Sequence, residues 1–229
     1  MPPGFAFAAG AEIARFTARC PHRPFSATLR PVIDRILWNI MKLYGSYTSP
    51  FVRHCRVALA QAGLAFDFVE ADYGMSAEKS PTAKVPFFTD GDLVLTDSSS
   101  ILKYIREKSG GRFLADLDDC ENFAMTNTLL DSTINVFMLE NEGFGPEQIK
   151  YLGRQKKRIE SGLAALDKRF SPNRGKTPDL TRDGDLRCAC FLGWALFRKR
   201  ITLDGLDHLR DLLAAADRVE TFAATAPPG

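Results

Sequence analysis

The sequence predicts an α/β domain followed by an all-α domain, on three observations. From Met41 onward, segments with the patterns of strands and helices alternate in the order strand, helix, strand. Asp90-Gly91 lies between two apolar runs, which is the signature of a β-hairpin. Beyond residue 118, apolar residues recur at intervals of three and four, as on one face of a helix. We therefore expect a small mixed sheet with its helices, followed by an α-helical bundle.

The first domain is expected over residues 41–108. Ser49 as N-cap and Pro50 at the first helical position indicate where its first helix begins. The expected elements are strands at 41–44, 65–70, 85–89 and 93–95, helices at 50–61 and 98–108, and a loop with a short helical turn at 71–83. A parallel strand pair, joined to an antiparallel pair and closed by a helix, is the order of thioredoxin-like domains.

The second domain is expected over residues 119–223, after a linker at 109–118. Two apolar stripes predict its first two helices, and two more helices are expected at 186–197 and 206–216. The stripes consist of Phe123, Leu130, Ile134, Phe137 and Met138, and of Ile149, Leu152, Ile159, Leu163, Leu166 and Phe170. Every segment after the linker is therefore expected to be helical.

Residues 1–40 are expected to be an extension without regular structure. The segment is rich in proline and holds five Arg against Glu12 and Asp34. The preferred hypothesis is that Met41 is the natural start and that the upstream segment is read through. A transit-type targeting segment, which shares this charge bias, is the alternative.

Composition excludes several classes of function. The net charge is +2, and since residues 1–40 carry +3 of it, the remainder is nearly neutral and predicts no nucleic-acid partner. No apolar run approaches the ~18 residues of a membrane span. The five cysteines have neither the number of a disulfide framework nor the spacing of metal ligands. We expect reduced thiols, no metal and a cytoplasmic location.

A candidate anion site lies where the helix at 50–61 begins. Backbone N–H groups without helical partners and the positive end of the helix dipole favour a negative charge beside Ser49. A thiolate is an anion that would suit this place.

Three motifs resemble those of the glutathione S-transferase family, and the resemblance runs from Met41 to about Pro227. Ser49-Pro50-Phe51 resembles the first strand–helix junction of serine-type bacterial and plant members. Lys84-Val85-Pro86 resembles the family's cis-proline loop, and Asp97-Ser98 resembles the acidic-Ser pair that opens the third helix. The resemblance implies a homodimer with one glutathione site in each subunit.

For Ser49, the resemblance implies that the hydroxyl donates a hydrogen bond to the sulfur of glutathione and stabilises its thiolate. Tyr47, in the same loop, is the alternative donor, because other branches of the family use a tyrosine at a comparable place, and Thr48 is the third choice. The simpler interpretation of Ser49 is a helix cap without a catalytic role.

For the other two motifs, the resemblance implies binding of glutathione. A cis Val85-Pro86 bond would let the cysteinyl part pair with the Val85 backbone, and Lys84 would hold a carboxylate or remain solvated. Asp97 and Ser98 would bind the γ-glutamyl ammonium and carboxylate, although both residues are also ordinary helix caps.

The expected function is that of a cytoplasmic glutathione S-transferase in detoxification, which joins glutathione to small electrophilic apolar compounds. The electrophile is expected between the loop at 46–51 and the first two helices of the second domain. A glutathione-dependent isomerase or dehalogenase is one alternative. A non-catalytic module that binds glutathione or a partner is the other.

Several further residues carry expectations of their own. Cys55 is expected to fill the core, and His54 and His208 are expected to be solvated. In the family, a Ser or Thr caps the core helix of the second domain, with an Asp three residues later. Here Asp185 fits the Asp place, but Arg182 stands where the hydroxyl belongs. We expect a shifted or weaker helix start, which costs about 1 kcal/mol if nothing substitutes.

Overall fold

The computed structural model describes residues 40–171 and 178–228, which belong to one compact unit. The expected extension therefore lies outside the described residues, apart from Ile40. No helix in the described ranges combines the length and apolar character needed to cross a membrane. Below, residues 41–108 are called the sheet region and residues 117–223 the helical region; the division into two domains stays a prediction.

The sheet region holds a four-stranded mixed sheet in the order β2-β1-β3-β4. The strands are β1 (Met41–Gly45), β2 (Phe66–Glu70), β3 (Phe87–Asp90) and β4 (Leu93–Leu95). β1 runs parallel to β2 and antiparallel to β3, and β3 runs antiparallel to β4. The predicted parallel pair, antiparallel pair and hairpin are confirmed, although β3 begins two residues later than expected.

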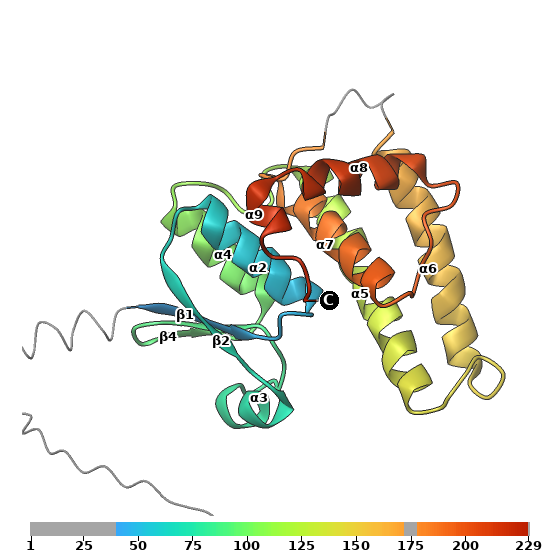
Figure 1. The fold of residues 1–229 in the computed structure, drawn as a ribbon, viewed down its shortest axis with the longest axis horizontal. Coiled ribbons are helices and arrows are strands. Elements are labelled where there is room, and N and C mark those ends of the chain that lie inside the picture. The colour runs from blue at the N-terminus through green and yellow to red at the C-terminus, as the bar shows by residue number, and fades with distance from the viewer. Residues whose placement is uncertain (1–39, 172–177, 229) are drawn as a thin grey trace, which may run out of the picture. The chain divides into compact units, whose positions relative to one another are not determined.

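Three helices accompany the sheet. α2 (Pro50–Gln61) and α4 (Ser98–Lys108) lie on one face of it, and α3 (Tyr73–Lys79) lies on the other face in Figure 1. The bounds of α2 and α4 match the prediction, because Ser49 and Asp97 accept N-cap hydrogen bonds at the two helix starts. The region is thioredoxin-like, as expected.

The helical region contains α5 (Leu117–Asn141), α6 (Lys150–Arg169), α7 (Asp183–Phe197), α8 (Asp207–Asp217) and the short α9 (Glu220–Ala223). Its core joins apolar side chains from all five helices, among them Leu130, Leu163, Phe191, Leu212 and Phe222. One member of the predicted stripes is misplaced: the side chain of Met138 is 57% exposed. An all-helical second part is confirmed.

α2 is buried on two sides because α7 packs against it from the helical region. Its Val52 and Cys55 belong to the core under the sheet, whereas Val57 belongs to the core of the helical region. The expectation that His54 is solvated is therefore wrong. His54 is fully buried, and its Nε2 lies 3.1 Å from a carboxylate oxygen of Asp183.

α7 begins without a cap from its own sequence, since Arg182 at the N-cap position makes no side-chain cap. The cap comes from α5 instead: Asp119 Oδ1 accepts a 2.7 Å hydrogen bond from the Gly184 N–H. A second bond, from the Ala115 N–H to Asp119 Oδ2 at 2.9 Å, fixes the carboxylate. Asp119 thus substitutes for the missing hydroxyl and offsets the expected cost.

Candidate functional site

A cavity of about 730 Å³ opens beside the N-terminus of α2. Three parts of the chain line it: the loop before α2, the segment from the end of β2 into α3, and α5. A smaller cavity of about 270 Å³ adjoins it at the N-terminus of α4 and shares Phe51, Lys84, Val85 and Asp131 with it. The two cavities together are lined by Ser49, Lys84, Val85, Pro86, Asp97 and Ser98, the predicted site residues other than Tyr47.

Ser49 lies at the mouth of α2 and lines the larger cavity. Its Oγ accepts a 3.4 Å hydrogen bond from the Val52 N–H, and no bond donated by this hydroxyl occurs among the described residues. Since a hydroxyl both accepts and donates, the proton of Ser49 remains available to a ligand. Capping and donation to a ligand are therefore compatible at this residue.

Tyr47 is held away from the cavity lining by two neighbours. Its ring lies 4.6 Å from the ring of Phe68, and the guanidinium of Arg56 lies 4.9 Å from the Tyr47 ring centroid. Its neighbour Ser46 lines the larger cavity, with its hydroxyl 3.1 Å from that of Thr48. The loop therefore presents Ser46 and Ser49 to the cavity, rather than Tyr47.

The predicted cis-proline loop contributes residues to both cavities. The Val85-Pro86 peptide bond is cis, as the resemblance implied. Lys84 is exposed and, like Val85, lines both cavities.

The third motif opens α4. Asp97 Oδ1 accepts a 2.7 Å hydrogen bond from the Ser99 N–H, so Asp97 is the N-cap of this helix. Ser98 is buried, and its Oγ accepts a 3.0 Å hydrogen bond from Nη2 of Arg187. Asp97, Ser98 and Ser99 all line the smaller cavity. The N-terminus of α4 favours an anion at this place.

Sequence reasoning missed the contribution of the helical region to the site. α5 contributes Asn127 and Asp131 to the smaller cavity, and Oδ1 of Asn127 is buried without a hydrogen-bond partner among the described residues. α6 lines neither cavity, although the first two helices of the second domain were expected there.

Arg187, which donates to Ser98, was also missed, although the sequence held one signal for it. It is the single basic residue within an otherwise apolar helix segment, 186–197.

The cysteines of the described residues are free, and three of the four are buried. Burial raises the pKa of Cys55 to about 12 and that of Cys190 to about 11, and it also raises the pKa of Cys188. These thiols are protonated at neutral pH and poorly nucleophilic. Cys55 is a core residue, as expected.

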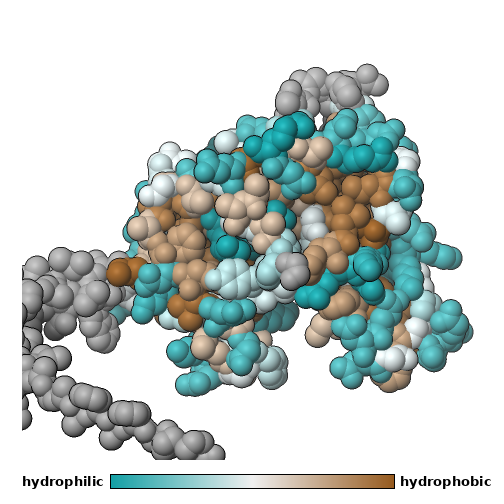
Figure 2. Space-filling view, viewed as in Figure 1, coloured by the Kyte–Doolittle hydropathy of each residue, from teal (hydrophilic) through white to brown (hydrophobic). Residues whose placement is uncertain are grey.

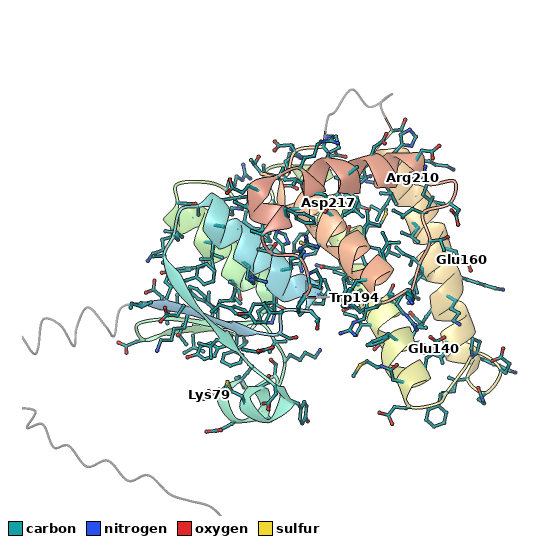
Figure 3. The ribbon with its side chains drawn as sticks, viewed as in Figure 1. Lys79, Glu140, Glu160, Trp194, Arg210 and Asp217 are labelled. Atoms are coloured by element: carbon teal, nitrogen blue, oxygen red, sulfur yellow. The ribbon has the colours of Figure 1, made fainter. Side chains whose placement is uncertain are left out.

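A second large cavity, of about 600 Å³, lies between α5, α6 and the segment after α7. Apolar side chains gather at the surface over this area in Figure 2, and Figure 3 marks two of its acidic residues, Glu140 on α5 and Glu160 on α6. Glu140 pairs with both Lys156 and Arg200 at 2.8 Å. None of the predicted site residues lines this cavity.

Comparison with known proteins finds similarity to glutathione S-transferases. The family model described as "Glutathione S-transferase, N-terminal domain" matches residues 43–113. The chain is 29% identical to the uncharacterized GST-like protein YibF of Escherichia coli strain K12, over 82% of this chain and 99% of that protein. It is 34% identical to the probable glutathione S-transferase GSTF2 of Oryza sativa subsp. japonica, over 42% of this chain and 48% of that protein.

Solved structures share the fold. A glutathione S-transferase from Methylobacillus flagellatus KT, crystallised with glutathione, aligns with a TM-score of 0.72 at 23% identity, over 82% of this chain and all of that one. The transferase from Methylobacterium radiotolerans JCM 2831, in complex with glutathione sulfonate, aligns with a TM-score of 0.70 at 21% identity, over 82% of this chain and 95% of that one. The chain is thus similar to glutathione S-transferases in its N-terminal part and to YibF along nearly all of that protein, and it shares the fold of these solved structures.

Proposed function

We propose that this protein is a glutathione S-transferase that joins the thiolate of glutathione to small, electrophilic, apolar compounds. The observation that carries the proposal is the position of Ser49, whose hydroxyl lies at a helix N-terminus and lines a cavity with its proton available. The similarity to glutathione S-transferases, and the glutathione found in a crystal structure of the same fold, support the choice of ligand.

The chemistry requires a thiolate, because the neutral thiol is a poor nucleophile. A free thiol with a pKa of about 8.5 is only a few per cent ionised at pH 7. Lowering this pKa by about 2 units requires roughly 2.7 kcal/mol of preferential stabilisation of the anion. A hydrogen bond from Ser49 and the N-terminus of α2 together supply an amount of this order. Ser49 acts as a donor and forms no covalent bond.

The smaller cavity is the proposed binding place for the γ-glutamyl end of glutathione. Ser98 and the N-terminus of α4 would hold its carboxylate, and Asp97 would hold its ammonium. The backbone of Val85, before the cis-proline, would pair with the cysteinyl part, and Lys84 would hold a carboxylate.

The larger cavity is the proposed place of the electrophile. Phe51, Ile134 and Met138 give it an apolar wall next to Ser49. The exposure of Met138, which the apolar pattern of α5 left unexplained, fits a flexible side chain that contacts varied small molecules.

The test is the rate of conjugation of glutathione to a chlorodinitroaromatic electrophile at pH 6.5. Ser49→Ala is expected to lower the rate by about 10- to 100-fold, while much of the glutathione affinity remains. This factor corresponds to the free energy of a hydrogen bond to a charged group. Because this substitution also removes a helix cap, Ser49→Asp is a second variant. It retains the cap, cannot donate and adds a charge that repels the thiolate, so the rate should fall further than in Ser49→Ala while thermal stability is maintained.

Other outcomes would redirect the proposal. A rate unchanged in both Ser49 variants but lowered in Tyr47→Phe would move the role to Tyr47. Binding of glutathione without turnover of this electrophile in the unmodified protein would contradict general conjugation. Assays of glutathione-dependent isomerisation and dehalogenation would then separate a specialised enzyme from a binding module.

We also propose a cytoplasmic location. The free cysteines of the described residues support it, since reduced thiols persist in reducing compartments. Recovery of the protein from the periplasm or from an organelle during cell fractionation would contradict this location.

A further inference from the structure

Arg187 is a charged residue at the centre of the core. It lies on α7 and is fully buried. Its guanidinium carbon lies 4.6 Å from the ring centroid of Phe123 and 4.9 Å from that of Phe51. The aromatic rings compensate part of the cost of burying a cation, although a cation–π contact is worth only about 1–2 kcal/mol.

The polar partners of Arg187 are too few for its charge. One nitrogen, Nη2, donates to Ser98 Oγ, whereas Nε and Nη1 are buried without a partner among the described residues. No carboxylate within the described ranges lies within ion-pair distance of it, in contrast to Arg106, whose Nη2 lies 2.9 Å from Asp183. The carboxylates of Asp97 and Asp183 stabilise the charge of Arg187 only from farther away. A buried charge with no carboxylate in direct contact is unfavourable, so a further anion near it would be stabilised.

The surroundings of the guanidinium indicate where such an anion would bind. Ser98, its hydrogen-bond partner, and Phe51, one of its two rings, both line the smaller cavity. The N-terminus of α4 opens into the same cavity. Since Ser98 Oγ accepts from Arg187, the hydroxyl proton of Ser98 is left to point at a ligand.

We propose that Arg187 is a positioning residue that makes the smaller cavity select a carboxylate, acting through Ser98. Its guanidinium orients the Ser98 hydroxyl as a donor, and its charge, which no carboxylate contacts directly, attracts an anion bound beside Ser98. The inference rests on the proposed function, in which the ligand is glutathione and the anion is its γ-glutamyl carboxylate.

The test compares glutathione with an analogue that lacks only this carboxylate, 4-aminobutanoyl-cysteinyl-glycine. Dissociation constants for both are measured by calorimetry on the full chain. Arg187→Met, which keeps most of the side-chain volume, is expected to weaken glutathione binding by about 10- to 100-fold and to leave binding of the analogue unchanged. Arg187→Lys, which keeps the charge, is expected to restore part of the preference for glutathione.

The matched control is Arg53→Met. Arg53 is also buried, but it donates to the Phe222 carbonyl at 3.0 Å and lines neither cavity. This variant is expected to lower the melting temperature without changing the ratio of the two dissociation constants. A merely structural role for Arg187 predicts the same behaviour for Arg187→Met.

Each outcome decides the inference. Equal weakening of both ligands by Arg187→Met, or no weakening of either, would overturn it while leaving the proposed function in place. If Arg187→Met does not fold, Arg187→Gln takes its place, because the amide can still donate to Ser98 without a charge, and the same selective loss is expected. Failure of the unmodified protein to bind glutathione would overturn the proposed function and this inference together.

Discussion

His54 shows how burial decides the charge of a single residue. The pKa of His54 is lowered to about 4, first because burial disfavours the imidazolium and then because Arg187 repels it. The hydrogen bond to Asp183 acts in the opposite direction and is outweighed. The folded protein therefore holds this imidazole in its neutral form throughout the pH range of ordinary assays.

This shift predicts a pH-dependent loss of stability. The unfolded chain binds the His54 proton near pH 6.5 and the folded chain only near pH 4, so stability falls as the pH falls through this window. His54 alone contributes about 2 kcal/mol of the loss between pH 7 and pH 5. Urea unfolding at both pH values should show a correspondingly smaller loss in His54→Asn. Equal losses in the two proteins would contradict the assignment.

At the same scale, the sequence predicted the residues at the mouths of α2 and α4 correctly as helix caps. Ser49 and Asp97 act within a few residues of their own position, and the hydrogen bonds to Val52 and Ser99 follow from local geometry. Arg187 and Ser98 are 89 residues apart, and no local rule connects them.

At the scale of elements, the start of α7 depends on close approach to α5. A Cβ at Gly184 would lie 2.5 Å from the backbone oxygen of Asp119 and 2.8 Å from Cβ of Asn122. Only glycine permits this approach, which also brings the Gly184 N–H to the capping carboxylate of Asp119. The absence of a hydroxyl at residue 182 is thus compensated by a neighbouring helix.

A pair of glycine substitutions tests this contact. Gly184→Ala is expected to lower the free energy of unfolding by about 2 kcal/mol, because two helices must move apart. Gly153→Ala, on α6, is the control, and it is expected to stabilise the protein. Nothing lies within 4 Å of its added Cβ, so the free energy of unfolding should rise by about 0.5–1 kcal/mol. Urea unfolding measures both. A Gly184→Ala protein as stable as the unmodified one would show that α5 and α7 adjust freely.

At the scale of the molecule, buried polar contacts join the sheet region to the helical region. Arg106 on α4 reaches Asp183 on α7 and also donates to the side chain of Gln61 at 3.2 Å. Arg53 on α2 lies 3.7 Å over the ring of Phe222 and holds the C-terminal segment. These contacts explain why the described residues belong to one compact unit rather than two.

We further predict that two copies of the chain assemble, as the resemblance of its motifs implied. Leu93 and Val94 on the edge strand β4, and Leu117 at the start of α5, are exposed apolar side chains that a second copy could cover. Light scattering should then give twice the 25.4 kDa of one chain, with the value maintained on dilution to micromolar concentration. A mass of 25.4 kDa at high concentration would contradict the assembly.

The sequence by itself determined the order of the elements, the ends of α2 and α4, and the three motifs that line the cavities. These features depend on caps, turns and periodic apolar residues, which act over a few positions. Only the tertiary structure decided that His54 is buried, that Asp119 caps α7, and that Arg187 lies behind Ser98. The physical reason is that burial and long-range hydrogen bonds depend on which elements pack together, and the packing of α7 against α2 and α5 has no local signal.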